Sequence, residues 1–453
     1  MRKFVRNWVS VAMVAILFCI DAMALDGGWR GELTVGQMKL PLVFNFSENE
    51  AGETSCTMDS PSQGAAGIPV NVMLCTADSV ALECKVIGAG FNGGVSPDSI
   101  TGIFTQRGFS FPLTLKRDAP LEERRPQTPK APYPYTVRDT VFVTNDGVTL
   151  SGTLSIPEHD GKQTVSAVVM VTGSGPQNRD EELFEHKPFA VIADYLARNG
   201  VASFRYDDRG TGKSGGDFRK GTTYTFKDDA KSALDFMRSI PGIGKVGVLG
   251  HSEGGTIAFM LGAEKVSDFI ISLAGMAVTG KETLMAQNAR SLGKSGLTDK
   301  ERENSLAVIG SLFDELATQG KQGVSTALDI DSIAKSRGVE VPPIVLASLR
   351  SVQRARSPWF DTFIGIDPGE YISKIKCPVL AVNGDKDTQV DAEPNLSVIK
   401  KNCPKAEIRL MPSLNHLMQH AVTGELDEYN EIRETISLDV LRLALDFIKK
   451  ISQ

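Results

Sequence analysis

The chain has 453 residues, more than one ordinary domain needs, so two or three domains are expected. Hydrophobic residues make up 41% of it and charged residues 23%, which is typical of a soluble globular protein with a large core. The formal net charge is only -6 and no basic run occurs, so a nucleic-acid partner is not expected.

The first 24 residues have the pattern of a cleavable export signal. Arg2, Lys3 and Arg6 form a positive start, an apolar run follows over Val11–Ile20, and Ala22–Ala24 has the small residues of a cleavage site. A membrane anchor is the alternative, but the run is well short of the ~20 apolar residues that a spanning helix needs. We expect cleavage after the last alanine of this site, export to the periplasm or the medium, and no stable membrane insertion.

The cysteines do not form a complete disulfide framework. Cys19 lies inside the leader, where bulky Phe18 before it does not suit a lipid-attachment signal. Cys377 and Cys403 each precede a predicted strand, and those strands should be neighbours, so this pair forms either a disulfide or two free buried thiols. The cysteines outside the leader are five, an odd number with no spacing that suits zinc: Cys56, Cys75, Cys84, Cys377 and Cys403.

Residues 25–117 predict a small all-β domain, because short alternating runs are separated by clusters of Gly, Asn, Ser and Asp. Residues 88–93 match the dinucleotide-binding pattern G-x-G-x-x-G. That pattern works only where a helix N-terminus follows the glycines, and turn residues follow here, so the match is accidental. Residues 118–135 contain five prolines among charges and predict a stiff, extended linker between domains.

From residue 136 onward the pattern is α/β. Residues 140–144 and 149–156 predict a hairpin closed by the turn Asn145-Asp146-Gly147. Apolar strands then alternate with amphipathic helices such as Phe189–Arg198, which predicts a doubly wound, mostly parallel sheet covered on both faces. The predicted strands are Ala167–Val171, Val201–Tyr206, Val246–Leu249, Phe269–Leu273, Val379–Val382 and Ile408–Met411.

One long interruption breaks this alternation between about residues 279 and 357. It is rich in helix formers, as in Glu301–Ala317 and Ile344–Arg356, and it has no run that would extend the sheet. Helices inserted at this point should lie over the C-terminal ends of the strands, where α/β sheets bind ligands. We therefore expect a helical cap, and helices packed elsewhere on the domain are the alternative.

The motif Gly250-His251-Ser252-Glu253-Gly254-Gly255 indicates a catalytic serine. A bare G-x-S-x-G also occurs by chance, but here an apolar strand precedes it and a helix-forming run follows it. A sharp strand-to-helix turn strains the serine backbone, requires small neighbours and lifts the hydroxyl clear of the sheet. Ser252 is therefore the candidate nucleophile, and a turn without chemistry is the alternative.

A serine nucleophile needs a base and an acid that orients it. Of the five histidines, His416 and His420 follow the final strand, and His416 lies in the loop at its end, so we favour His416. The side chain of His251 should point away from its serine neighbour. Asp387 follows the strand before, in Asn383-Gly384-Asp385-Lys386-Asp387, and is our choice of acid, with Asp385 as the runner-up. The chain order Ser, Asp, His is that of α/β-hydrolases.

Two backbone N–H groups should bind the negative oxygen that develops in such a reaction. One is expected from Glu253, directly after the nucleophile, and the other from Ser174 in the loop Thr172–Pro176. Gly210–Ser214 looks like the end of a phosphate-binding loop, but Asp207 stands where the first glycine of that motif is required. Residues 205–210 are instead expected to form a rigid loop beside the site, with their charges paired internally.

These motifs together resemble those of bacterial α/β-hydrolase esterases, often grouped with dienelactone-hydrolase-like and serine-aminopeptidase-like proteins. The resemblance covers residues 136–453 and rests on residues 172–177, 206–210, 250–255, 383–387 and 414–416. It implies hydrolysis of carboxylic esters through an acyl-enzyme without metal or cofactor, with Ser252, Asp387 and His416 as the triad. One departure is Thr172, where many α/β-hydrolases have histidine before the oxyanion glycine.

Three functions compete on the sequence. The first is an exported carboxylesterase for small or medium acyl esters. The second is an aminopeptidase or acyl-peptide hydrolase, which should need cap acids such as Glu301, Glu303, Asp314 or Glu315 to hold a substrate amine. The third is a carbohydrate- or envelope-binding β module joined to a degenerate hydrolase, which an intact triad argues against. The sequence indicates no oligomeric state.

Overall fold

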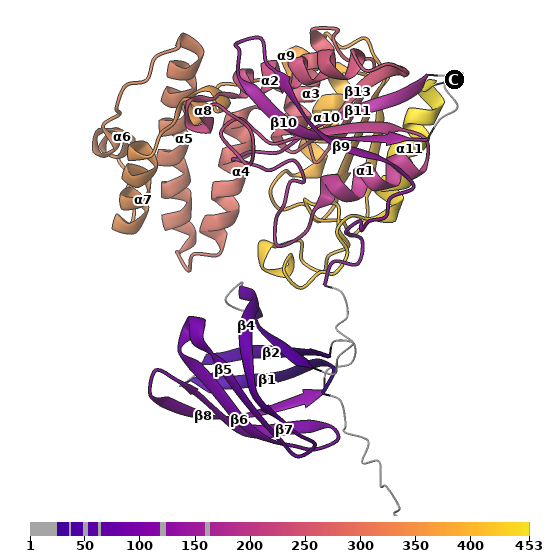
Figure 1. The fold of residues 1–453 in the computed structure, drawn as a ribbon. Coiled ribbons are helices and arrows are strands. Elements are labelled where there is room, and N and C mark those ends of the chain that lie inside the picture. Colours follow the sequence, from indigo (N-terminus) through magenta and orange to yellow (C-terminus); the bar gives the residue numbers. More distant parts are fainter. Residues whose placement is uncertain are drawn as a thin grey trace, which may run out of the picture. The chain divides into compact units, whose positions relative to one another are not determined.

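The computed structural model describes residues 25–35, 38–48, 53–61, 65–117, 124–158 and 164–452. The predicted leader, residues 1–24, lies outside these ranges, as do His159 and residues 118–123 of the linker. The chain divides into two compact units, Met1–Arg124 and Arg125–Gln453 (Figure 1). Among the described residues, no helix combines the length and apolar character needed to cross a membrane.

The first unit is a closed antiparallel barrel of eight strands, which confirms the predicted all-β class. Consecutive strands pair, and β1 closes the barrel against β8. Large side chains fill the interior, including Trp29, Phe44 and Phe91. The G-x-G-x-x-G match ends a short 3-10 turn, Lys85–Ile87, and continues into β6, so no helix N-terminus follows it. The strands are β1 Gly27–Val35, β2 Met38–Glu48, β3 Thr54–Ser60, β4 Ala65–Cys75, β5 Ser79–Cys84, β6 Ala89–Val95, β7 Ser99–Gln106 and β8 Phe109–Arg117.

The second unit is built on a mixed eight-stranded sheet in the order β16-β15-β14-β13-β11-β12-β10-β9. The strands from β11 to β16 pair in parallel, and β10 runs antiparallel to both β9 and β12. The predicted hairpin and the six predicted strands are confirmed. The strands are β9 Tyr135–Val143, β10 Thr149–Pro157, β11 Val165–Val171, β12 Ala202–Tyr206, β13 Ile243–His251, β14 Ile270–Leu273, β15 Val379–Gly384 and β16 Glu407–Met411.

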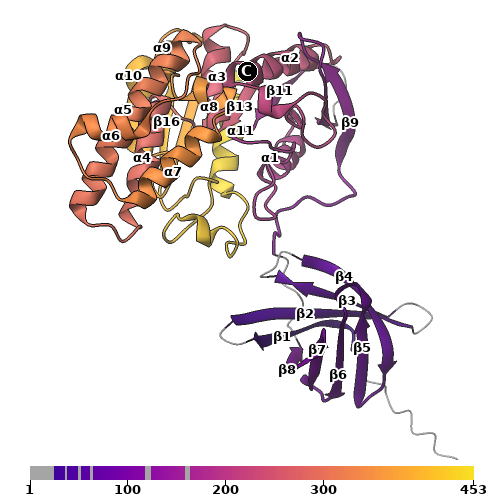
Figure 2. The ribbon, with the colours of Figure 1, turned by 90° about the vertical axis from the view of Figure 1, so that its left-hand side faces the viewer.

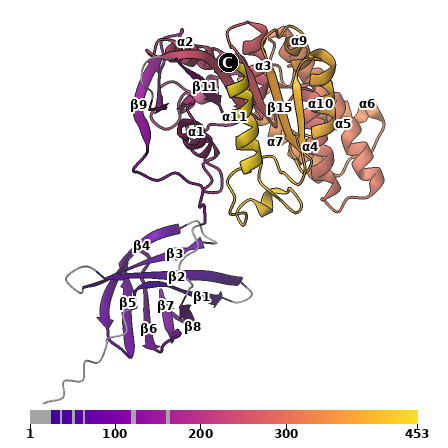
Figure 3. The same ribbon diagram turned by 90° about the vertical axis from the view of Figure 1, so that its right-hand side faces the viewer.

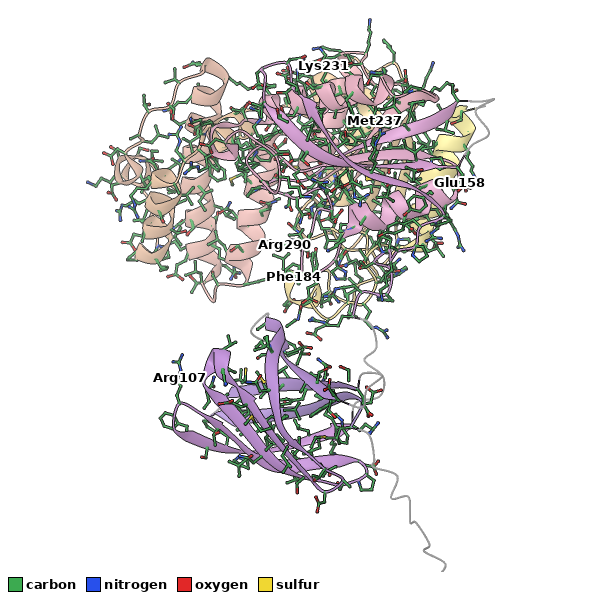
Figure 4. All side chains as sticks on the ribbon, viewed as in Figure 1. Arg107, Glu158, Phe184, Lys231, Met237 and Arg290 are labelled. Carbon is green, nitrogen blue, oxygen red and sulfur yellow. The ribbon has the colours of Figure 1, made fainter. Side chains whose placement is uncertain are left out.

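Helices cover both faces of this sheet, as its near-continuous apolar strands require. On one face, α1 Pro188–Arg198 and α11 Leu438–Ser452 share an apolar core with alternate strand residues; Figure 3 shows α11 in yellow alongside the sheet. On the other face lie α2 Thr223–Arg238, α3 Glu253–Ala263 and α10 Ala392–Asn402, with the short α9 Pro368–Ile372. Met237 of α2, labelled in Figure 4, is fully buried in this second core.

Five of the six helices between β14 and β15 form the interruption (Figure 2). Capping boxes at Thr279 and Thr298 begin the first two helices, and the left-handed Gly323 ends the second. Arg290 of α4, labelled in Figure 4, pairs with Asp391 in the loop after β15. The insertion therefore contacts the C-terminal edge of the sheet. Its helices are α4 Gly280–Gly293, α5 Asp299–Gln322, α6 Ile330–Arg337, α7 Pro343–Arg354 and α8 Pro358–Phe363.

The described part of the proline-rich segment, residues 124–134, has neither helix nor strand. It is not free of the second unit, because Arg125 is 6% exposed and donates to the carbonyl groups of Phe184 and Asn430. The five cysteines from Cys56 to Cys403 are described, and all are free thiols. Cys377 and Cys403 precede β15 and β16, which pair as neighbours, as expected.

Candidate active site

Ser252 stands at a sharp turn between β13 and α3, with φ 53° and ψ -119°. A residue with a Cβ rarely adopts this backbone conformation, so the turn is strained. The flanking glycines are required: a Cβ on Gly250 would lie 2.0 Å from the carbonyl oxygen of Gly254, and a Cβ on Gly254 would lie 2.1 Å from that of Val171. The sequence predicts this elbow and its small neighbours, and the structure has both.

Asp387 and His416 come together in the loops that follow β15 and β16. Nδ1 of His416 lies 2.8 Å from Oδ2 of Asp387, and both side chains are buried. The other carboxylate oxygen, Oδ1, accepts the backbone N–H groups of Gln389 and Val390, each at 2.8 Å. These bonds fix the carboxylate, which in turn orients the imidazole and leaves its Nε2 as the nitrogen that can exchange a proton.

The runner-up residues lie in other surroundings. Asp385 accepts the backbone N–H of Ser413 and holds a turn. His420 is exposed and pairs with Glu434. His186 is buried, and its Nδ1 lies 3.0 Å from the hydroxyl oxygen of Thr435.

Three segments meet around Ser252. The ring of His251, its neighbour, lies 4.7 Å from the ring of His416 between centroids. A Cβ on Gly173, in the loop after β11, would lie 3.1 Å from Cβ of Ser252. In the described part of the chain, the Ser252 hydroxyl and the His416 ring are not hydrogen-bonded to each other.

The two predicted oxyanion residues are joined to each other through their side chains. The Ser174 hydroxyl donates to Oε2 of Glu253 at 2.7 Å. The N–H of Glu253 stands in the first turn of α3, where backbone N–H groups have no partner within the helix. The N–H of Gly173 is already taken, because it donates to the Glu181 carboxylate at 2.7 Å.

The Glu253 carboxylate is buried and collects donors from three parts of the fold. Besides Ser174, it accepts the Thr223 hydroxyl at 2.7 Å and the Trp359 indole N–H at 2.9 and 3.0 Å. Burial raises the pKa of Glu253, and its hydrogen bonds counteract only part of that rise. The sequence predicts a role for the backbone of this residue and misses its side chain.

Asp208 holds both ends of residues 172–177, the predicted oxyanion loop that contains Ser174. Its carboxylate accepts the Thr172 hydroxyl at 3.1 Å and the Gln177 N–H at 2.9 Å. Burial raises the pKa of Asp208 well above its usual value, and the nearby acids Glu181 and Glu253 raise it further. Thr172, the departure from the family pattern, therefore serves as a donor to a buried acid.

The expectation that residues 205–210 pair their charges internally is wrong. The charged side chains of this loop bond to residues of neighbouring segments instead, because the loop is enclosed between the segment after β11 and helix α2. The bonds are Arg205 to Asp180 at 2.7 Å, Asp207 to Arg179 at 2.7 Å, and Arg209 to Asp229 at 2.5 and 2.7 Å.

A cavity of about 400 Å³ opens beside the oxyanion loop. Ser174 and Gly175 form one wall, and Phe218 and Trp359 supply aromatic surface. A cavity of this size holds a small organic molecule. Among the described residues, no cluster of His, Cys, Asp or Glu could hold a metal ion.

Residues 185–301 match a family model described as serine aminopeptidase, S33. This range includes Ser252 and ends before Asp387 and His416. Esterase EstD of Thermotoga maritima is 24% identical over 282 residues, which cover 61% of this chain and 59% of that protein. A polyketide transferase of Penicillium crustosum is 29% identical over 145 residues, 31% of this chain and 45% of that protein. The chain thus spans about half the length of these curated relatives.

Solved structures give weaker likenesses. An esterase of Pyrococcus furiosus is 18% identical with a TM-score of 0.43, covering 70% of this chain and 91% of that one. Est1E of Butyrivibrio proteoclasticus, solved with ferulic acid, is 17% identical with a TM-score of 0.39, covering 69% of this chain and 97% of that one. The sheet order, the helices on both faces and the family model together support an α/β-hydrolase fold for the second unit.

Proposed function

We propose that this chain is a serine hydrolase that cleaves carboxylic esters through an acyl-enzyme, with Ser252, Asp387 and His416 as its triad. The observation that carries the proposal is the Asp387–His416 hydrogen bond at the sheet edge where the strained Ser252 turn stands. The match to an esterase from Thermotoga maritima supports ester hydrolysis as the reaction class.

In this reaction the Ser252 oxygen attacks the acyl carbon while its proton passes to Nε2 of His416. The bond to the alcohol oxygen then breaks, and the departing alcohol takes that proton. Water attacks the resulting acyl-serine, gives its proton to the same nitrogen, and releases the carboxylic acid as the serine recovers a proton. Asp387 stabilises the imidazolium in both halves, and the N–H groups of Ser174 and Glu253 receive the negative oxygen.

The cavity supports small or medium acyl groups as substrates. Its volume of about 400 Å³ and its aromatic lining by Phe218 and Trp359 suit a small acyl or aryl group, and the Arg219 side chain also lines it. Ser174 lines this cavity, so a group bound there would lie next to the proposed oxyanion site.

A serine aminopeptidase is the second candidate, because the matched family model carries that description. Its substrate amine would need a carboxylate partner. Two of the four cap acids considered have partners of their own: Glu301 caps its own helix at Thr298, and Asp314 pairs with Lys281. Glu303 and Glu315 are exposed. The Glu253 carboxylate beside the cavity already accepts three side-chain donors, so ester hydrolysis stays the leading proposal.

The test is labelling with a fluorophosphonate, followed by assays with p-nitrophenyl esters from acetate to decanoate and with amino-acid anilides. We expect labelling and short-ester turnover that Ser252→Ala abolishes. Ester turnover that survives in Ser252→Ala would refute the triad. Labelling with anilide turnover above ester turnover would favour the aminopeptidase, and no labelling of either protein would favour a binding role.

Export is a further part of the proposal. Expression with the native leader in a bacterial host, fractionation and N-terminal sequencing test it. We expect a periplasmic or secreted product that begins at Leu25, and an uncleaved cytoplasmic product would contradict export.

A further inference from the structure

A second acid–histidine pair lies buried beneath the elbow. Nδ1 of His251 lies 2.9 Å from Oε1 of Glu181, and the two residues are 6% and 2% exposed. Neither residue has a part in the acyl-transfer steps described above. A buried carboxylate is costly unless it is paired and hydrogen-bonded, so the fold maintains this pair against a desolvation penalty.

The pair touches all three segments of the proposed machinery. Oε1 of Glu181 also accepts the N–H of Gly173 at 2.7 Å, directly before the oxyanion residue Ser174. Nε2 of His251 lies 2.9 Å from the backbone oxygen of His416. His251 itself is part of the elbow. One buried pair thus connects the oxyanion loop, the nucleophile turn and the loop of the proposed base.

The partners of His251 define its protonation. The carbonyl oxygen of His416 only accepts, so Nε2 of His251 must carry a proton. Nδ1 faces a carboxylate, which also only accepts when ionised. Neutral imidazole has a single N–H, so with an ionised Glu181 both bonds are made only by the imidazolium form. Burial acts to lower the pKa of His251, but the charge and hydrogen bond of Glu181 outweigh it and raise the pKa, with smaller contributions from the carbonyl of His416 and from Asp387.

The backbone that presents Glu181 is itself strained. Glu181, Phe184 and Glu185 have φ of 51°, 52° and 64°, in the left-handed region that residues with a Cβ seldom occupy. Phe184 is labelled in Figure 4 and locates this turn. A residue in this conformation is strained and persists only where its surroundings hold it. The contacts of Glu181 are part of what holds this turn in place.

We propose that Glu181 and His251 form a permanent carboxylate–imidazolium pair that positions the oxyanion loop and the His416 loop relative to Ser252. The kinetic consequence of this pair rests on the proposed function. The charge of the pair rests on the two hydrogen bonds of His251. Both are positioning residues, because they act through the backbone of Gly173 and His416 and not on the substrate.

The kinetic test compares Glu181→Gln with Glu182→Gln, the same change at the exposed neighbouring residue. Because small displacements of reacting groups can cost up to about 10²-fold in rate, we expect Glu181→Gln to lower kcat about 10- to 100-fold with KM changed less than about threefold. Fluorophosphonate labelling of Ser252 should be slower and still complete. Glu182→Gln should match the native chain. A native kcat in Glu181→Gln, or a loss seen in KM alone, would overturn the positioning role.

The charge state is tested on the native full chain, so a variant that fails to fold does not end the test. NMR of ¹⁵N-histidine-labelled protein should show both ring nitrogens of His251 protonated at pH 8, with assignment from His251→Gln. A neutral His251 ring at that pH would overturn the pair. If the native chain neither labels nor turns over esters, the proposed function fails while this spectrum still decides the pair.

Discussion

The indole N–H of Trp359, on the helical insertion, donates to both carboxylate oxygens of Glu253, the residue after the elbow serine. The same carboxylate accepts the hydroxyl of Ser174 in the oxyanion loop. The insertion and the oxyanion loop are therefore both hydrogen-bonded to the buried carboxylate of Glu253. A substitution in the insertion should therefore change the rate of acyl transfer as well as the binding of the acyl group.

Trp359→Phe tests this connection, because it removes the N–H donor while keeping an aromatic ring that can stack on Phe363. Hydrogen bonds to charged groups contribute about 1.5–3 kcal/mol, so we expect kcat/KM to fall about tenfold for short and medium esters alike. Steady-state kinetics over the acyl series measure this. Thr362→Ala, on the same helix, is the control, because this hydroxyl donates to the carbonyl of Pro358 within that helix. Equal kcat/KM for both variants would show that the indole bond has no part in the rate.

Asp387→Asn should reduce kcat about 10³- to 10⁴-fold without unfolding the chain. The asparagine amide would face Nδ1 of His416 with a donor, which favours the wrong tautomer of the base. Asp385→Asn is the matched control, since Asp385 accepts the backbone N–H of Ser413 and holds a turn. We expect it to lose less than about tenfold in kcat. The opposite ranking would make Asp385 the acid and would require the loops to rearrange on binding substrate.

The sequence predicts the parts of this fold that local physical chemistry determines. Strands appear as short apolar runs, and the predicted Val246–Leu249 is the centre of β13, Ile243–His251. The elbow is readable because the glycines at 250 and 254 have no space for a Cβ. The helices α5 and α7 of the insertion are readable because helix formers are dense over Glu301–Ala317 and Ile344–Arg356.

The supporting contacts of the site could not be read in the same way. Glu181 binds a histidine 70 residues away, and Trp359 binds a glutamate 106 residues away. No periodicity or turn motif encodes such pairs, because they depend on which loops the sheet order brings together. The failed expectation of internal pairing near Arg209 has the same cause, since its partner Asp229 belongs to a helix and not to its own loop.

Asp208→Asn should stabilise the protein more as the pH rises. The pKa of Asp208 is raised in the folded state, so its contribution to stability is fully present below the unfolded value of 3.8 and is lost as pH rises through the folded value. Asparagine has no charge to bury and keeps an oxygen for the Gln177 N–H. The Tm difference between Asp208→Asn and the native chain should therefore become more positive from pH 4 to pH 8. A difference that is flat or falls over this range would contradict a raised pKa.

Arg209→Met should be among the most destabilising single changes in the second unit. Arg209 and Asp229 form a two-bond ion pair with side chains 9% and 3% exposed, so the substitution leaves a buried carboxylate of α2 without its arginine partner. Breaking such a pair from one side costs about 3–5 kcal/mol in the free energy of unfolding, which urea denaturation measures. Removing both partners, as in Arg209→Met with Asp229→Leu, should recover most of that loss, because the buried charge is then gone.

The control for this prediction is Arg219→Met, which breaks a pair with Asp217 in which the arginine side chain is 88% exposed. Exposed ion pairs contribute about 0–1 kcal/mol, so this variant should unfold at nearly the native urea concentration. Equal losses for the two arginine variants would mean that burial does not set the cost. A double variant no more stable than Arg209→Met alone would mean that the loss comes from packing of the long side chain. The unpaired Asp229 charge is the cause only if Arg209→Met greatly lowers the free energy of unfolding and the added Asp229→Leu restores most of it.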